Sequence, residues 1–150
     1  MTLDLSAAVA SADGTTIGYQ VTGQGPALVI WHGAMGSAAS HAELAAELRD
    51  TYTVYLPDRR GRGLSGPHRA DHGIETEVAD LAALLAVTGA RDVIGESSGA
   101  IVALEAALRL PQLRRVAIFE PPLIVGDSLS TALSGVTGTR WRAVTWHQLW

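Results

Sequence analysis

Short runs of apolar and β-branched residues recur along the chain and predict strands. Residues 27–31 (Ala-Leu-Val-Ile-Trp) are continuously apolar, a pattern typical of a strand that is buried on both faces of a sheet. Other runs, bounded by Gly, Pro or charged residues, predict strands at 15–22, 52–56, 92–94 and 114–119. The run at 92–94 is about two residues shorter than a buried central strand usually is.

Between these runs, apolar residues recur at helical spacing and predict three helices. The first extends from Ser37, a residue type that caps helix N-termini, to about Arg49. The second covers 75–87 and ends at Gly89, whose freedom to adopt a positive φ suits a helix C-cap. The third covers 98–110 and ends because a proline follows it.

The alternation of strands and helices through short loops predicts an α/β fold. Such a pattern gives right-handed βαβ units and a mostly parallel sheet with helices on both faces. The pattern stops near residue 126, because residues 127–150 show no clear apolar period and hold three of the four tryptophans. We therefore expect one domain over residues 1–126 and an atypical C-terminal tail over 127–150.

Composition excludes several classes of function. The net charge is -4 and the pI is near 5.6, which argues against a nucleic-acid partner or binding to an anionic membrane. The chain has no cysteine and no lysine, so thiolate zinc sites, cysteine nucleophiles and Schiff-base chemistry are excluded. The longest apolar runs are far below the roughly 20 residues that span a bilayer, and the N-terminus has no secretory pattern. We expect a cytoplasmic protein.

The strongest candidate for chemistry is the segment Gly95-Glu96-Ser97-Ser98-Gly99, where an apolar run meets a predicted helix. A nucleophilic serine needs a tight, strained turn that presents its hydroxyl to a base, and glycines two residues before and after permit that turn. Ser97 is thus the candidate nucleophile. The helix that begins at Ser98 directs its positive end and free N–H groups at developing negative charge.

A second candidate element, His32-Gly33-Ala34, directly follows the buried run at 27–31. A loop in that place can direct a backbone N–H at the reacting carbonyl oxygen. We expect the N–H groups of Ala34 and Ser98 to form an oxyanion hole. We interpret His32 itself as a residue that anchors this loop.

Together with the segment 58–66 (Asp-Arg-Arg-Gly-Arg-Gly-Leu-Ser-Gly), these motifs resemble those of the α/β-hydrolase family. The family has an HG loop after its third strand, a D-R-x-G-x-G-x-S loop after its fourth and a G-x-S-x-G elbow after its fifth. The resemblance covers about residues 12–126, and Phe119 to Pro122 resembles the end of the sixth strand in small bacterial members. It implies a serine hydrolase that acts on a small ester-like substrate and needs no metal or cofactor.

The same resemblance indicates that the C-terminal strands, the cap and two members of the catalytic triad have no counterpart in this chain. A serine nucleophile needs a histidine base and an acid, which follow it in the family in the order Ser, Asp or Glu, His. Glu120 or Asp127, and then His147, are the residues that could take these places. The alternative is a non-catalytic remnant, or a half-domain that associates with itself or another chain through an unpaired sheet edge.

Charged residues outside the elbow have simpler interpretations. Asp58, at a strand end, is expected to hold its loop by accepting backbone N–H groups. The arginines of this loop are expected to form a solvated or carboxylate-paired cluster rather than to bind phosphate or RNA; they are Arg59, Arg60 and Arg62. A second loop carries metal-ligand residue types at short spacing but no sign of rigidity, so no metal site is assigned to it; these residues are His68, Asp71 and His72.

Overall fold

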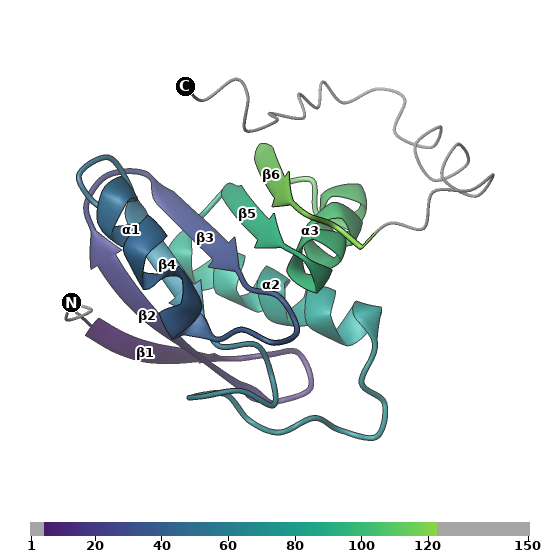
Figure 1. The fold of residues 1–150 in the computed structure, drawn as a ribbon. Coiled ribbons are helices and arrows are strands. Elements are labelled where there is room, and N and C mark those ends of the chain that lie inside the picture. The colour runs from purple at the N-terminus through teal and green to yellow at the C-terminus, as the bar shows by residue number, and fades with distance from the viewer. Residues whose placement is uncertain (1–4, 123–150) are drawn as a thin grey trace.

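The computed structural model describes residues 5–122, which form a six-stranded mixed sheet (Figure 1). The strands are β1 (Leu5–Ala10), β2 (Thr16–Gly23), β3 (Ala27–Trp31), β4 (Thr53–Pro57), β5 (Asp92–Glu96) and β6 (Arg115–Phe119). Their order in the sheet is β1-β2-β4-β3-β5-β6. The pairs among β4, β3, β5 and β6 are parallel, and β1 and β2 are antiparallel to their neighbours. The predicted α/β class, with a mostly parallel sheet, is confirmed.

Helices cover both faces of this sheet, as the alternation predicted (Figure 1). Helices α2 (Ile74–Thr88) and α3 (Ser98–Arg109) pack against one face, where they bury Val29 and Trp31. On the opposite face α1 (Ala42–Leu48) packs on β3 and β4, where Ile30 is buried. Successive β3 side chains therefore enter different cores, which is why this strand is apolar at every position.

Three details differ from the sequence-based expectations. Strand β1, which was not predicted, pairs along its whole length with β2. The predicted helix at 37–49 is a 3-10 turn (Ala38–His41) followed by α1. The expectation of a shortened strand at 92–94 is wrong, because β5 continues through Gly95 and Glu96, which pair with Ile118 and Phe119 of β6.

Strand β6 forms one edge of the described sheet, where β5 is its neighbour. None of the helices within residues 5–122 is long and apolar enough to cross a membrane. The expected boundary at residue 126 and the tail at 127–150 lie outside the described residues.

Candidate active site

The turn between β5 and α3 holds Ser97 in a strained backbone conformation. Its φ of 52° and ψ of -123° lie in a region that non-glycine residues rarely adopt. The Ser97 N–H donates to the carbonyl of Phe119 at 2.9 Å, which ties the turn to the end of β6. The Ser97 side chain is half-buried, at the carboxyl end of β5, where parallel α/β sheets place their sites.

Close backbone packing on both sides of Ser97 explains the two flanking glycines. A Cβ at Gly95 would lie 2.7 Å from the Cα of Ala100, and a Cβ at Gly99 would lie 2.3 Å from the carbonyl oxygen of Trp31. Neither approach is compatible with a side chain. The expected need for glycine at both positions therefore has a direct steric cause.

The loop that follows β3 lies against this turn. A Cβ at Gly33 would be 3.0 Å from the Cβ of Ser97, and the Gly33 N–H donates to Oε2 of Glu96 at 2.8 Å. The N–H of Ala34 has no hydrogen-bond acceptor within residues 5–122. Ala34 thus offers an unused donor on the loop that contacts the candidate nucleophile.

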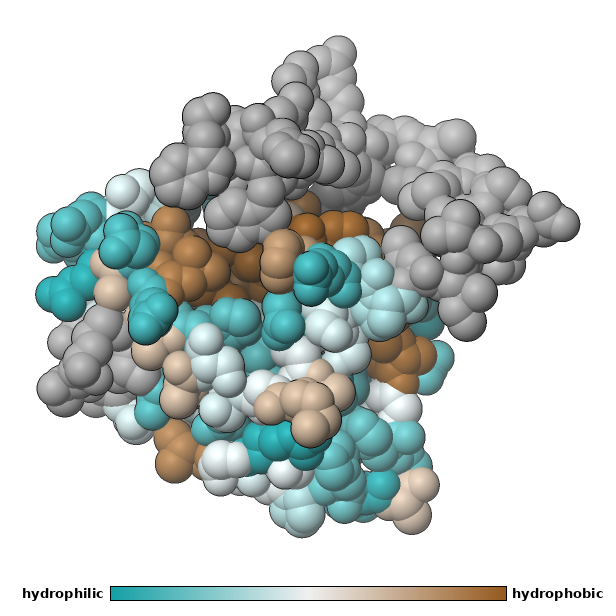
Figure 2. Space-filling model, viewed as in Figure 1, coloured by the Kyte–Doolittle hydropathy of each residue, from teal (hydrophilic) through white to brown (hydrophobic). Residues whose placement is uncertain are grey.

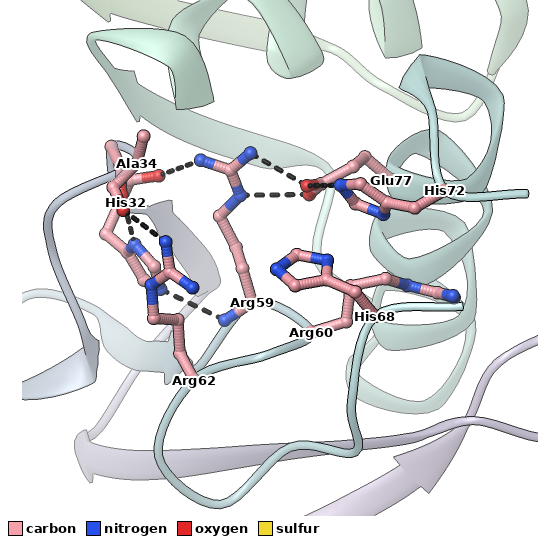
Figure 3. Close-up of a pocket in the computed structure, with 9 residues that line it drawn as sticks. His32, Ala34, Arg59, Arg60, Arg62, His68, His72 and Glu77 are labelled. Carbon is pink, nitrogen blue, oxygen red and sulfur yellow. Dashed lines mark hydrogen bonds and ion pairs between the residues drawn. The ribbon is translucent and has the colours of Figure 1, made fainter. Parts of the chain in front are cut away.

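His32 anchors this loop, as interpreted from the sequence. Its side chain is 1% exposed, and Nδ1–H donates to the carbonyl of Gly33 at 2.6 Å. On the other side of the ring, Nε2 accepts the backbone N–H of Arg59 at 3.0 Å (Figure 3). Because an N–H must donate to Nε2, the ring is neutral with its proton on Nδ1. Burial is the main cause that lowers the pKa of His32 from 6.5.

The buried His32 ring predicts a pH dependence of stability. The unfolded chain takes up a proton on His32 near pH 6.5, whereas the folded chain resists it, so the free energy of unfolding falls as the pH drops below about 6.5. Urea unfolding at pH 7.5 and 5.5 measures this fall, and His32→Gln should make it shallower. NMR of the ring nitrogens should show a neutral ring with its proton on Nδ1 at pH 6; a ring that is charged there would contradict the prediction.

Arg59 links three segments around the elbow. Its Nη1 donates to Oγ of Ser98 at 2.9 Å and to the carbonyl of His32 at 3.0 Å. Its Nε and Nη2 donate to the two carboxylate oxygens of Glu77 on α2, at 2.9 and 2.8 Å. This guanidinium therefore holds the start of α3, the end of β3 and α2 together.

The other charged residues of the β4–α2 loop support its shape. Asp58 accepts the N–H of Ala38 at 2.8 Å and the N–H of Leu64 at 3.0 Å, as predicted.

Arg60 is buried and donates to Asp80 through Nε at 2.7 Å and Nη2 at 2.6 Å. Its Nη1 lies 3.0 Å from Oδ2 of Asp13. The predicted carboxylate pairing is confirmed for Arg59 and Arg60. Arg62 forms no ion pair with a carboxylate of the described residues and donates to the backbone carbonyls of Gly61 and Ala34.

The described residues do not complete a triad around Ser97. Within residues 5–122, no histidine forms a hydrogen bond with Ser97 Oγ. Glu120 follows β6, is exposed, has a φ of 46° and forms no ion pair with the described residues. Asp127 and His147 lie outside the described residues. The rings of His68 and His72 lie 4.2 Å apart, but no group of three metal-ligating side chains occurs in the described part of the chain.

Comparison with known proteins identifies the family. The model of the "Alpha/beta hydrolase family" matches residues 28–150, which is most of the chain. The chain belongs to the α/β-hydrolase family. The resemblance predicted from the three motifs is thereby confirmed.

Similar α/β hydrolases include characterised and uncharacterised proteins. An α/β hydrolase from Sphaerobacter thermophilus is 42% identical with a TM-score of 0.75, over 81% of this chain and 48% of that chain. The esterase RhEst1 from Rhodococcus is 28% identical with a TM-score of 0.66, over 75% of this chain and 44% of that one. The uncharacterized hydrolase YraK of Bacillus subtilis is 35% identical over 75% of this chain and 43% of its own length. The chain thus spans less than half the length of these relatives.

Proposed function

We propose that this chain carries the nucleophile and oxyanion hole of a serine hydrolase that acts on a small ester-like substrate. The observation that carries the proposal is the conformation of Ser97, with a φ of 52° between β5 and α3. Strain of this kind costs about 1–3 kcal/mol and is retained mostly where it serves function. The family membership and the similarity to the esterase from Rhodococcus support an acyl-transfer reaction.

In the proposed reaction Ser97 Oγ attacks the acyl carbon of the substrate while a general base accepts its proton. The carbonyl oxygen becomes an oxyanion, which the N–H groups of Ala34 and Ser98 stabilise. The protonated base then donates its proton to the leaving alcohol, and the bond between the acyl carbon and the alcohol oxygen breaks to leave an acyl-enzyme. Water, deprotonated by the same base, attacks the acyl carbon, and the acid is released as Ser97 Oγ recovers the proton. The base is a histidine outside residues 5–122, since no described histidine bonds Ser97, and Glu120 or a residue outside this range is the orienting acid.

A chimera tests this proposal. Residues 123–150 are replaced by the remaining C-terminal part of the Sphaerobacter hydrolase, and hydrolysis of p-nitrophenyl acetate is measured beside that of chain 1–150. We expect turnover by the chimera and only background hydrolysis by the chain alone. Turnover by the chain alone, dependent on Ser97, would identify a base within it, with His147 as the first candidate. A folded chimera without turnover would contradict the proposal.

Arg59 is expected to act as a positioning residue in this reaction. In Arg59→Gln the contacts to Ser98 Oγ and to the carbonyl of His32 are lost, so the two proposed oxyanion donors are held less firmly. We expect kcat of the chimera to fall about tenfold with little change in KM, because the oxyanion is stabilised only in the transition state. Arg91→Gln, at an exposed arginine that binds the carbonyl of Gln112, is the control and should leave kcat unchanged.

The edge strand β6 favours a second candidate role, a half-domain that associates with another copy of the chain. On the α1 side of the sheet Ile94 and Ala117 are only half-buried, and Phe119 is 39% exposed. Figure 2 shows hydrophobic residues gathered on the upper part of the molecule. Edge strands with apolar faces favour pairing between chains. Light scattering should then show a mass that rises with concentration; a monodisperse monomer that melts cooperatively would exclude this role.

A further inference from the structure

A small cavity, lined mostly by arginine and histidine residues, lies beside the proposed oxyanion loop (Figure 3). Its volume is about 130 Å³, which is room for one small group rather than for a whole drug-sized ligand. His32, Gly33 and Ala34 form one wall, and the β4–α2 loop and the start of α2 form the rest. Arg59, which also lines the cavity, contacts Ser98 directly, so the cavity adjoins the elbow.

Two of the three arginines that line this cavity are paired with carboxylates. Arg60 contacts Asp80 and Asp13, and Arg59 contacts Glu77, the single carboxylate residue of the lining. Arg62 also lines the cavity, but its Nη1 and Nη2 donate only to the carbonyls of Gly61 and Ala34. Within residues 5–122, Arg62 therefore has no carboxylate to balance its charge.

Two histidines also line the cavity. The rings of His68 and His72 meet edge to face, and Nε2 of His72 lies 3.4 Å from Oε1 of Glu77. Burial and then the charges of His72 and Arg62 lower the pKa of His68. The lowered pKa favours the neutral His68 ring, so the charge that the cavity offers to an anion is that of Arg62.

We propose that this cavity binds a carboxylate of the substrate, with Arg62 as its main partner and His68 beside it. The substrate class is then an ester whose acyl or alcohol part carries a carboxylate. A guanidinium pairs with a carboxylate through two parallel hydrogen bonds, which a neutral group of the same size does not offer. Because Arg62 already holds the carbonyl of Ala34 at 2.6 Å, the bound carboxylate lies next to the oxyanion loop. This assignment rests on the proposed function.

Binding is tested apart from catalysis by NMR titration of chain 1–150 with succinate and with its neutral analogue succinamide. The signals to follow are the Ala34 amide and the His68 ring. We expect succinate to shift both and succinamide to shift neither. Equal shifts with the two probes, or none with either, would overturn the carboxylate assignment.

Variants of Arg62 then test whether this residue is the main partner of the bound carboxylate. Arg62→Gln should weaken succinate binding about tenfold, as expected for loss of a charged hydrogen-bond donor. Arg62→Lys, which keeps the charge, should restore part of the affinity. Arg91→Gln is the matched control, because Arg91 is exposed and also binds a backbone carbonyl. If Arg62 only fixes the loop, Arg62→Gln will leave succinate binding unchanged, which overturns its role.

Ser97→Ala separates this inference from the proposed function. The variant should bind succinate as the unmodified chain does, because Ser97 does not line the cavity. A chimera without turnover together with selective succinate binding would contradict the nucleophile and leave the anion site in place. Turnover by the chimera without selective succinate binding would contradict the anion site alone. Loss of succinate binding in Ser97→Ala would show that the anion site is not separate from the elbow at Ser97.

Discussion

Substitution of Ser97 by alanine is expected to remove ester hydrolysis from the chimera described above. The reaction requires an oxygen nucleophile at the top of β5, and the strained turn presents no other hydroxyl in the same conformation. Removal of the nucleophile from a serine enzyme lowers kcat by about 10⁴-fold to 10⁶-fold, and only a residual rate from binding and oxyanion stabilisation remains. Initial rates with p-nitrophenyl acetate measure the loss.

Ser98→Ala is the matched control for this substitution. It removes a hydroxyl one residue further along but keeps the backbone N–H that is proposed to hold the oxyanion. Its effect should be limited to the lost contact from Arg59 Nη1, so kcat should fall by no more than about tenfold. Comparable losses in Ser97→Ala and Ser98→Ala, or retained turnover in Ser97→Ala, would show that Ser97 is not the nucleophile.

Replacement of Arg60 by methionine is expected to have the largest effect on stability. The side chains of Arg60 and Asp80 are both fully buried, and two hydrogen bonds join them. Removal of the arginine leaves the Asp80 carboxylate buried without its counter-charge. Breaking such a pair by removing one partner lowers the free energy of unfolding by about 3–5 kcal/mol. Urea denaturation at pH 7 measures this difference.

Two further variants show that the loss comes from burial of the unpaired charge. Arg109→Met breaks an ion pair with Glu105 on the surface of α3 and should lower the free energy of unfolding by less than about 1 kcal/mol. Arg60→Met combined with Asp80→Leu removes both charges and should recover much of the loss. If Arg60→Met is as stable as Arg109→Met, the buried pair does not stabilise the fold in the way the structure implies.

The fold was predictable where the signal is local. The apolar run at 27–31 and the helical periodicity at 75–87 placed β3 and α2, since burial on one or two faces leaves a direct pattern in the sequence. Strand β1 left no such pattern, because its pairing with β2, rather than its own residue preferences, makes it a strand. The extension of β5 into Gly95 likewise depends on its hydrogen bonds to β6.

The candidate site, like the fold, was predictable from the sequence only in part. Residue types and their spacing predicted Ser97 as a candidate nucleophile, because a tight strand-to-helix turn requires glycine at neighbouring positions, and the resemblance of three motifs indicated the α/β-hydrolase family. The sequence pattern gave no sign of the link from Arg59 to Ser98 and Glu77, or of the contact between Glu96 and Gly33, which are 63 residues apart. These contacts exist because β3, β4 and β5 are adjacent in the sheet and bring their carboxyl ends together. Which polar atoms then meet is decided by tertiary packing, and it is this packing that leaves Arg62 without a carboxylate partner in the described part of the chain.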